Sequence, residues 1–271
     1  MVALSRSLLH SVGVIDDPWA VTFLGRRRRM LARAFHTRPL SRSTTGPTFS
    51  FLAARTRFFD QLVLDAFEAG CTQAVIVGAG YDTRAWRLAR PGVRFFEVDH
   101  PATQRRKQRL AAPGEVTFVP ADLRSDPLDE VLTTAGLATD RTSIFLLEGL
   151  TMYLTADVTR TVLSALAKVA APGSRLVALF SASGGGSGTG PSGAIAALVR
   201  ASWRLAGEPT YQWASRDATR AMLPSTGWRI VAEHGAPELV ERFLAGTDMA
   251  VTGSNPGLYC LVAERPPQAH R

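Results

Sequence analysis

The sequence predicts an α/β protein built around a mostly parallel β-sheet with helices on both faces. Short, strongly apolar segments recur from residue 72 onward, and segments with helical periodicity lie between several of them. The first apolar segment runs directly into glycines, and the following three end in acidic residues. These features are typical of a Rossmann-like fold, in which ligands bind at the carboxyl ends of the strands.

Seven strands are expected in this sheet. Five come first, with the sequences QAVIVGAG, VRFFEVDH, VTFVPADL, SIFLLEGL and SRLVALFSA. The segment TADVTRTVLSALAKVAAPG has helical periodicity and connects the last two of them. Two later segments, GWRIVAEHG and GLYCLVAER, predict a final pair of antiparallel strands at the sheet edge.

Residues 1–70 are predicted to form an N-terminal helical cap, and residues 71–271 the core. In the cap, AVTFLGRRRRMLARAF predicts a helix with a very basic face. FLAARTRFFDQLVLDAFEAG predicts a second helix that stops at Gly70, and the polar segment RPLSRSTTGPTFS between the two predicts a loop.

A Gly/Ser-rich segment at residues 181–193 follows the fifth predicted strand. Its composition predicts flexibility, and its position suits either a plain linker or a mobile lid over the ligand site. Residues 194–225 predict a helical insertion on the substrate side of the core.

The chain has 271 residues, a formal net charge of +8 and a pI near 10.4. Four consecutive arginines at positions 26–29 form either a solvated helix face or a basic mouth for an anionic ligand. Aromatic residues do not interleave with them, so nucleic-acid binding is the less favoured interpretation. The chain has no apolar run long enough to span a bilayer and no convincing signal peptide, which predicts a cytoplasmic protein. Cys71 and Cys260 have no zinc-like spacing, and no metal site is predicted.

Gly78, Ala79 and Gly80 end the first predicted strand, where glycine lets a ligand approach the backbone closely. The GxGxxG pattern of diphosphate-binding turns is incomplete, because Thr83 stands at the position of its third glycine. A short glycine turn followed by acids suits a cofactor without phosphates, such as S-adenosyl-L-methionine. Asp99 lies 21 residues after Gly78, at the end of the second strand. Its carboxylate is placed either to accept hydrogen bonds from ribose hydroxyls or to cap the strand end.

The third and fourth strands also end in acids. Asp122 could accept a hydrogen bond from the adenine amino group, with Leu123 as an apolar wall, or it could cap a helix. Glu148 ends an otherwise apolar strand, where a carboxylate is costly unless it is paired. A cationic sulfonium or amino group nearby would pair it. Tyr153, a few residues later, either shapes the methyl-transfer pocket or packs at its rim.

Five segments together resemble the leucine carboxyl methyltransferase-like family of class I S-adenosyl-L-methionine-dependent methyltransferases. They are ARTRFFDQLVLDAF, VIVGAGYDTRAWRL, FFEVDHP, ADLR and LLEGLTMYLT, and the upstream IDDPWAVTFL is similar to the family's Asp-Pro-aromatic segment. The resemblance covers roughly residues 10–180. The family includes protein phosphatase carboxyl methyltransferases and bacterial polyketide O-methyltransferases such as the tetracenomycin carboxyl methyltransferase. The fold that it implies is the Rossmann-like class I methyltransferase fold.

The resemblance also implies roles for single residues. Arg55 would bind the carboxylate of S-adenosyl-L-methionine, and Arg6 matches a basic residue that the family places near the same carboxylate. Gly78 would line the methionine portion, Asp99 would hold the ribose, and Glu148 would lie near the methionine end. The full predicted cofactor-binding set is Arg6, Arg55, Gly78, Ala79, Gly80, Asp99, His100, Asp122, Leu123, Glu148, Gly149 and Tyr153.

The predicted reaction is in-line transfer of a methyl group to an oxygen, which leaves S-adenosyl-L-homocysteine. A carboxylate acceptor is ionised at neutral pH and needs no general base, whereas a phenol usually does. Candidate bases are few: His36, His100 and His234 are each better explained as structural or exposed. His36 and Tyr153 are the residues kept as catalytic candidates. This favours a carboxylate, and the basic run at positions 26–29 favours an anionic small-molecule acceptor such as a polyketide or other natural product.

Several alternatives stay open at this point. Within the same class they are methylation of a phenolic hydroxyl and methylation of a protein C-terminal carboxylate. Outside it they are a nucleic-acid methyltransferase, an NAD-dependent oxidoreductase and a non-catalytic cofactor sensor on the same fold. The incomplete glycine pattern and the acids at the strand ends count against the oxidoreductase. The oligomeric state is not predicted.

Overall fold

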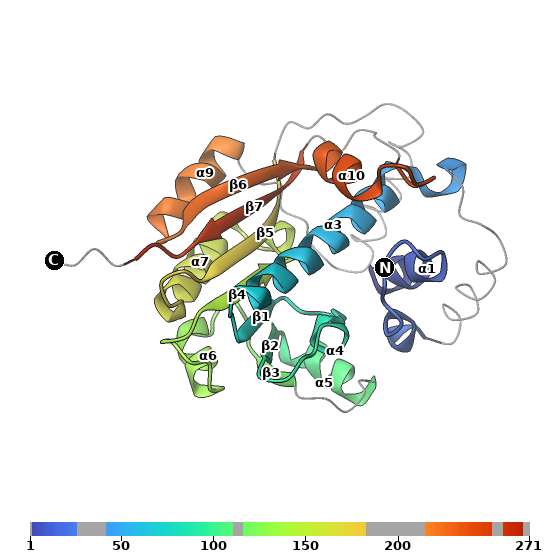
Figure 1. The fold of residues 1–271 in the computed structure, drawn as a ribbon. Coiled ribbons are helices and arrows are strands. Elements are labelled where there is room, and N and C mark those ends of the chain that lie inside the picture. Colours follow the sequence, from blue (N-terminus) through green and yellow to red (C-terminus); the bar gives the residue numbers. More distant parts are fainter. Residues whose placement is uncertain (1, 26–41, 111–115, 183–214, 251–256, 268–271) are drawn as a thin grey trace.

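The computed structural model describes residues 2–25, 42–110, 116–182, 215–250 and 257–267 (Figure 1). Its centre is a seven-stranded sheet with the strand order β3-β2-β1-β4-β5-β7-β6. The strands are β1 (Gln73–Val77), β2 (Arg94–Asp99), β3 (Val116–Pro120), β4 (Ser143–Leu147), β5 (Arg175–Ser181), β6 (Arg229–Gly235) and β7 (Leu258–Glu264). The predicted number of strands is confirmed.

Five strands run parallel, and β7 pairs antiparallel with both β5 and β6. The predicted antiparallel pair at the edge is therefore present, with β7 inserted between β5 and β6. The chain moves outward from β1 through β2 to β3 and then returns to place β4 on the other side of β1. The carboxyl ends of β1 and β4 thus form the switch point where sheets of this kind bind ligands.

Helices cover both faces of the sheet, because alternate strand residues are apolar on both sides. On one face α3 (Arg42–Glu68) and α10 (Ala236–Leu244) pack over Ala74, Ile76 and Ile144. Figure 1 shows α3 running diagonally across this face. On the other face α6 (Leu128–Thr134), α7 (Ala156–Val169) and α9 (Arg216–Ser225) pack over Val75, Val77 and Phe145.

The N-terminal region contains α1 (Val2–Ser11), the 3-10 turn η1 (Ala20–Phe23) and the long helix α3. The predicted helix at residues 51–70 is confirmed as the second part of α3, which ends at Glu68 before Gly70. The loop predicted for residues 38–50 is wrong for residues 42–50, which already belong to α3. Gly46 and Pro47 have low helix propensity, but propensity is a weak guide where a long packed helix follows. Of the predicted basic helix at residues 20–35, only Ala20–Phe23 is described as helical, and residues 26–35 lie outside the described residues.

Two further predictions fall largely outside the described residues: the Gly/Ser segment at residues 181–193 and most of the helical insertion at residues 194–225. Of the insertion, α9 is helical as predicted, and the Oγ of Ser215 caps it by accepting from the N–H of Ala218. The division into a cap at residues 1–70 and a core at residues 71–271 stays a prediction.

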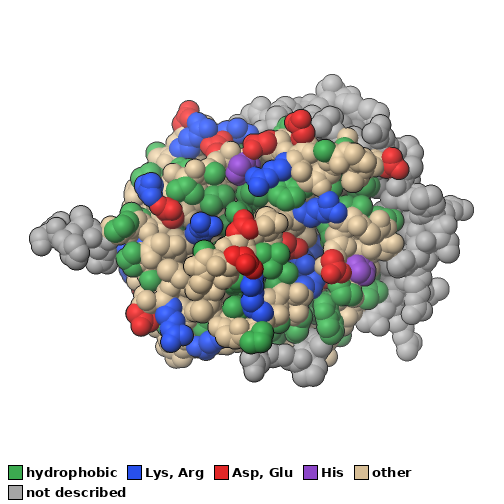
Figure 2. All heavy atoms as spheres, viewed as in Figure 1, with side chains coloured by type: hydrophobic (Ala, Val, Ile, Leu, Met, Phe, Trp, Pro, Cys, Tyr) green, Lys and Arg blue, Asp and Glu red, His purple; other side chains and the backbone are tan. Residues whose placement is uncertain are grey.

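Basic and acidic side chains intermingle over the face drawn in Figure 2. The positive net charge is therefore not gathered into a continuous basic track on this face, which gives no support there to nucleic-acid binding. Among the described residues, no helix is both long and apolar enough to cross a bilayer.

Candidate functional site

The carboxyl ends of the first four strands bring most of the predicted site residues to one edge of the sheet. The turn at residues 78–80, hereafter the glycine turn, follows β1 and lies between two partners. On one side the backbone N–H of Gly80 donates to Asp99 Oδ2 over 2.5 Å, and on the other side Gly78 packs against Leu150. The N–H groups of Gly78 and Ala79 both donate to the carbonyl of Val98, which fixes the turn against β2.

Gly78 satisfies a steric requirement of this turn. Its φ of +69° is a left-handed conformation that L side chains rarely adopt. A Cβ at this position would also lie 2.7 Å from Cδ1 of Leu150. Any larger residue here would therefore displace Leu150 and strain the turn.

Asp99 is held in one orientation by backbone donors. Its Oδ1 accepts from the N–H of His100 over 2.6 Å, in addition to the Gly80 contact. Burial raises the pKa of Asp99, and the two backbone N–H groups offset part of that rise. The Nδ1 of His100 accepts from the N–H of Ala102, so His100 caps the first turn of α5 (Pro101–Leu110). Asp99 keeps acceptor capacity for hydroxyl groups of a ligand.

The third strand end lies next to the second, since the N–H of Ala121 donates to the carbonyl of Asp99. Asp122 is partly buried, and its Oδ1 accepts from the N–H of Arg124 in a local turn. Leu123 is half-buried against the core. Asp122 thus stabilises a local turn and does not cap a helix, because α6 begins only at Leu128, with Pro127 before it. A second role toward adenine stays a prediction.

Glu148 follows β4 and forms an ion pair with Arg55 from α3, in which Arg55 Nε and Glu148 Oε1 are 2.7 Å apart. The side chains are 10% and 7% exposed, so both charges are largely shielded from water. Burial alone would raise the pKa of Glu148, but the guanidinium groups of Arg84, Arg55 and Arg6 outweigh it and lower the pKa to about 2. Glu148 is therefore a permanent anion beside a permanent cation. The sequence predicted both residues for the site, and the structure brings them together.

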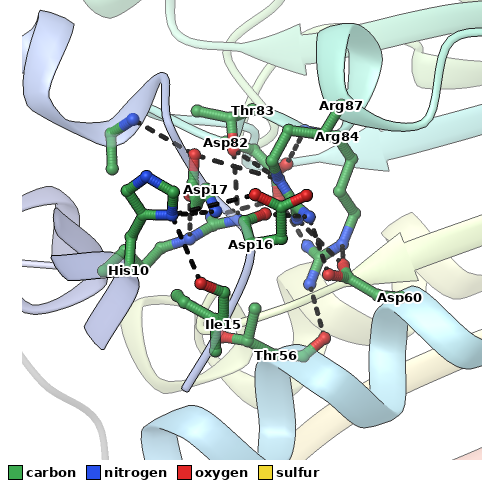
Figure 3. A network of polar contacts seen from close by, with 12 residues as sticks. His10, Ile15, Asp16, Asp17, Thr56, Asp60, Asp82, Thr83, Arg84 and Arg87 are labelled. Atoms are coloured by element: carbon green, nitrogen blue, oxygen red, sulfur yellow. Dashed lines mark hydrogen bonds and ion pairs between the residues drawn. The ribbon is translucent and has the colours of Figure 1, made fainter. Parts of the chain in front are cut away.

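Behind this pair lies a buried network of charges, part of which Figure 3 shows from close by. Arg84 of α4 (Arg84–Arg87) is fully buried and contacts Asp60, Asp82 and Glu148. Arg87 contacts both carboxylate oxygens of Asp60. None of these residues was predicted to have a role, although Asp82 and Arg84 lie in the segment VIVGAGYDTRAWRL. Charged residues directly after an apolar strand and its turn are the signal that could have identified them.

Arg6 lies on the cap side of the same network. Its Nε pairs with Asp17 Oδ2 at 2.8 Å, its Nη2 donates to Thr83 Oγ1 over 3.2 Å, and its Nη1 lies 3.9 Å from Asp82 Oδ2. It is 3% exposed. These contacts attach α1 to the segment after the glycine turn, and the predicted contact of Arg6 with the cofactor carboxylate stays a prediction.

The remaining predicted residues are less informative. Gly149 has a φ of +70°. Tyr153 belongs to the 3-10 turn η2 (Thr151–Tyr153) and is half-buried. His36 lies outside the described residues. The structure therefore assigns no catalytic role to either of the two catalytic candidates.

This fold and site define a class: a Rossmann-like domain with a backbone-oriented carboxylate at the end of β2 and a paired arginine and glutamate at its switch point. The model of the family described as leucine carboxyl methyltransferase matches residues 1–167, and the chain belongs to this family. The predicted family is confirmed.

Curated relatives agree with this family. A protein of Parafrankia sp. strain EAN1pec is 43% identical over 134 residues, which cover 47% of this chain and 43% of the relative. A protein of Mycobacterium avium strain 104 is 36% identical over 200 residues, which cover 65% of this chain and 61% of the relative. Both carry provisional names as S-adenosyl-L-methionine-dependent methyltransferases. The match spans less than two thirds of either relative.

Two solved structures share the fold. One, from Thermobifida fusca and provisionally described as a methyltransferase, has a TM-score of 0.58 and 17% identity and covers 97% of this chain and 94% of its own. The other, a DUF574 family protein from Streptomyces avermitilis, has a TM-score of 0.60 and 16% identity and covers 97% of both chains. At this identity the likeness concerns the fold alone. The predicted fold class is confirmed.

Proposed function

We propose that this protein is an S-adenosyl-L-methionine-dependent methyltransferase that methylates a carboxylate of a small molecule, such as a polyketide or another natural product. The observation that carries the cofactor assignment is the Arg55–Glu148 ion pair beside the glycine turn. The methionine part of the cofactor carries an ammonium and a carboxylate on one carbon. A buried anion and cation 2.7 Å apart match that pair of charges.

The other strand-end residues fit the rest of the cofactor. The lack of a side chain at Gly78 lets Leu150 pack directly against the turn, where a Cβ would collide with it. Asp99 is oriented by Gly80 and His100 and would accept hydrogen bonds from the two ribose hydroxyls. Asp122 and Leu123 would border the adenine. These residues follow three adjacent parallel strands, and their order along the sheet edge is the order of the cofactor's parts.

When bound, the cofactor supplies an electrophilic methyl group on its sulfonium. The residues of this chain then need to align the acceptor oxygen with that methyl group and exclude water. A carboxylate acceptor is already ionised at neutral pH, so no residue has to remove a proton from it. The net charge of +8 favours an anionic acceptor over a neutral one by raising its local concentration. The cytoplasmic location predicted from the sequence is part of this proposal.

Transfer of a labelled methyl group tests the acceptor class. The protein would be incubated with methyl-labelled S-adenosyl-L-methionine and matched pairs of aromatic polyketide acids and phenols, with Asp99→Ala as the inactive control. We expect label on the acids, in a product that mild base hydrolyses because it is an ester. Label only on phenols, in a base-stable ether, would contradict the carboxylate proposal. Label on a peptide C-terminal carboxylate alone would move the acceptor from small molecules to proteins.

A further inference from the structure

We propose that Arg84 is a positioning residue of the cofactor site, whose guanidinium holds the Glu148 carboxylate in its ligand-binding orientation. The inference rests on the proposed function, since it assigns Glu148 to the ammonium group of the cofactor. Arg84 itself lies behind Glu148, is fully buried and would act through it.

Two arginines contact Glu148, one at each oxygen of its carboxylate. Arg55 Nε holds Oε1, and Arg84 Nη1 lies 2.5 Å from Oε2. A carboxylate with a guanidinium group against each of its oxygens is restrained from rotating about its terminal C–C bond. With Arg84 absent, Oε2 would lose its described partner, and the carboxylate would be free to turn around its remaining contact with Arg55.

Arg84 is itself held in place by four other residues. Its Nη1 lies 2.5 Å from Asp82 Oδ2, and its Nε donates to Asp60 Oδ1 over 2.6 Å. Its Nη2 donates to the carbonyl of Thr56 over 3.5 Å, and the ring of Phe59 lies 5.5 Å from its guanidinium carbon. Through Arg84, the orientation of Glu148 is therefore fixed relative to α3 and to the segment that follows the glycine turn.

Arg84 also keeps Glu148 ionised. Burial raises the pKa of Glu148, and Arg84 is the largest of the influences that lower it. The groups facing Glu148 are Arg55 of α3, Arg6 of α1, Asp82 before α4 and the thiol of Cys260 in β7. Without Arg84 two cations would oppose Asp82 and burial, so the Glu148 pKa would rise and the carboxylate would titrate closer to neutral pH.

If Arg84 only stabilised the fold, its loss should have the same effect as the loss of a neighbouring arginine in the same network. Arg87 is that neighbour, and its replacement distinguishes a structural role from a positioning role. Arg87 lies one turn further along α4 and binds both oxygens of Asp60, as part of the same network. It has no described contact with Glu148. Loss of Arg87 should therefore weaken the packing of α4 on α3 without changing the orientation of Glu148.

The test is calorimetric titration of the full chain with S-adenosyl-L-methionine and with 5′-methylthioadenosine, which lacks the ammonium and carboxylate groups. Wild type, Arg84→Met, Arg84→Lys and Arg87→Met are compared between pH 6 and 9, with melting temperatures as the record of folding. We expect Arg84→Met to bind S-adenosyl-L-methionine at least about tenfold more weakly at pH 7, as for loss of a charged hydrogen bond. The loss should shrink as pH rises and Glu148 ionises. Arg84→Lys should recover part of the affinity.

In the control measurements, the affinity for the nucleoside is expected to stay nearly unchanged. Affinity for 5′-methylthioadenosine should stay within about threefold in each Arg84 variant, and Arg87→Met should bind both ligands as wild type does. If Arg84→Met does not fold, Arg84→Lys is combined with Glu148→Gln, and the inference requires little further loss of affinity in that background.

Three results would overturn the inference. They are unchanged affinity in Arg84→Met, equal losses for the two ligands, and a loss in Arg87→Met as large as that in Arg84→Met. A wild-type protein that bound 5′-methylthioadenosine but not S-adenosyl-L-methionine would contradict the role of Glu148, and this inference with it. A wild type that bound neither ligand would contradict the proposed function itself.

Discussion

Two buried glutamates show how the surroundings of a single residue decide its charge. Glu148 has two arginines against its carboxylate, and its pKa falls to about 2. Glu97 in β2 is fully buried and has one ammonium, that of Lys107, at 2.6 Å. Here burial prevails over the single cation and raises the pKa to about 7. One carboxylate is thus fixed as an anion, whereas the other can take up a proton near neutral pH.

This difference predicts a pH dependence of stability that belongs to Glu97. Between about pH 4.5 and about pH 7 the folded protein keeps a proton on Glu97 that the unfolded chain has lost. The contribution of Glu97 to the free energy of unfolding therefore falls as pH rises through that window. Glu97→Gln keeps the neutral shape and removes the titration. Between pH 5 and pH 7, we expect the free energy of unfolding of this variant to rise by about 1–3 kcal/mol relative to that of the wild type. Denaturant unfolding at a series of pH values measures this difference.

Comparison with Glu97→Gln cancels the titration of all other groups, and the window lies above the range where Glu148 protonates. Parallel stability curves for the two proteins across pH 5–7 would show that Glu97 titrates normally. In that case the Lys107 ammonium would outweigh the effect of burial.

Residues at strand ends were predictable from the sequence, and their buried partners were not. Asp99 and Glu148 are recognisable because each is an acid at the carboxyl end of a largely apolar strand. Arg84 and Lys107 reach their partners across the fold, from helices whose packing no local pattern specifies. Local sequence patterns therefore reveal the acids at the strand ends but not the buried cations that pair with acids of these strands.

At the scale of elements, the strands lie where short apolar segments predict them, and α7 lies where helical periodicity predicts it. The Thr155 Oγ1 caps α7 by accepting from the N–H of Val158, as its position before the helix suggests. The start of α3 was missed, because Gly46 and Pro47 carry a local signal that the long helix overrides. The segment that contains α1 and η1 is held together and attached to the rest of the molecule by contacts that the sequence did not reveal. These are the Arg6–Asp17 pair and the stacking of Phe23 on Tyr81, with ring centroids 5.1 Å apart.

The attachment of the cap gives a prediction for Arg6→Met. The change removes one partner of a buried pair whose side chains are 4% and 0% exposed, and such losses cost about 3–5 kcal/mol. We expect the effect to be local. Backbone amides of α1 should exchange hydrogen faster by at least about a hundredfold, while those of β1 and β4 keep wild-type rates.

The same variant tests the role that family resemblance gives to Arg6. Unchanged exchange in α1, together with loss of cofactor binding, would contradict the role in attaching the cap. That pair of results would support Arg6 as a direct ligand of the cofactor carboxylate.

At the scale of the whole molecule, the sheet order places the ends of β1, β2, β3 and β4 side by side, and all predicted nucleoside contacts come from these ends. The family match covers residues 1–167 and therefore includes all four. The region expected to shape the acceptor pocket follows β5 and includes residues 183–214, which lie outside the described residues. The fold was thus predictable, because it depends on a repeated strand-turn pattern. The acceptor was not, because it depends on a segment with no such pattern.

The central claim is that the carboxyl edge of this sheet binds S-adenosyl-L-methionine through Asp99 and its neighbours. The most direct test is calorimetric titration with S-adenosyl-L-methionine, S-adenosyl-L-homocysteine and NAD, on wild type, on Asp99→Ala and on Asp65→Ala. Asp65 lies exposed on α3 and serves as the matched control. We predict roughly micromolar binding of the two sulfur nucleosides to wild type and to Asp65→Ala, and its loss in Asp99→Ala. Binding of NAD in place of both would contradict the account and would make the glycine turn a dinucleotide site.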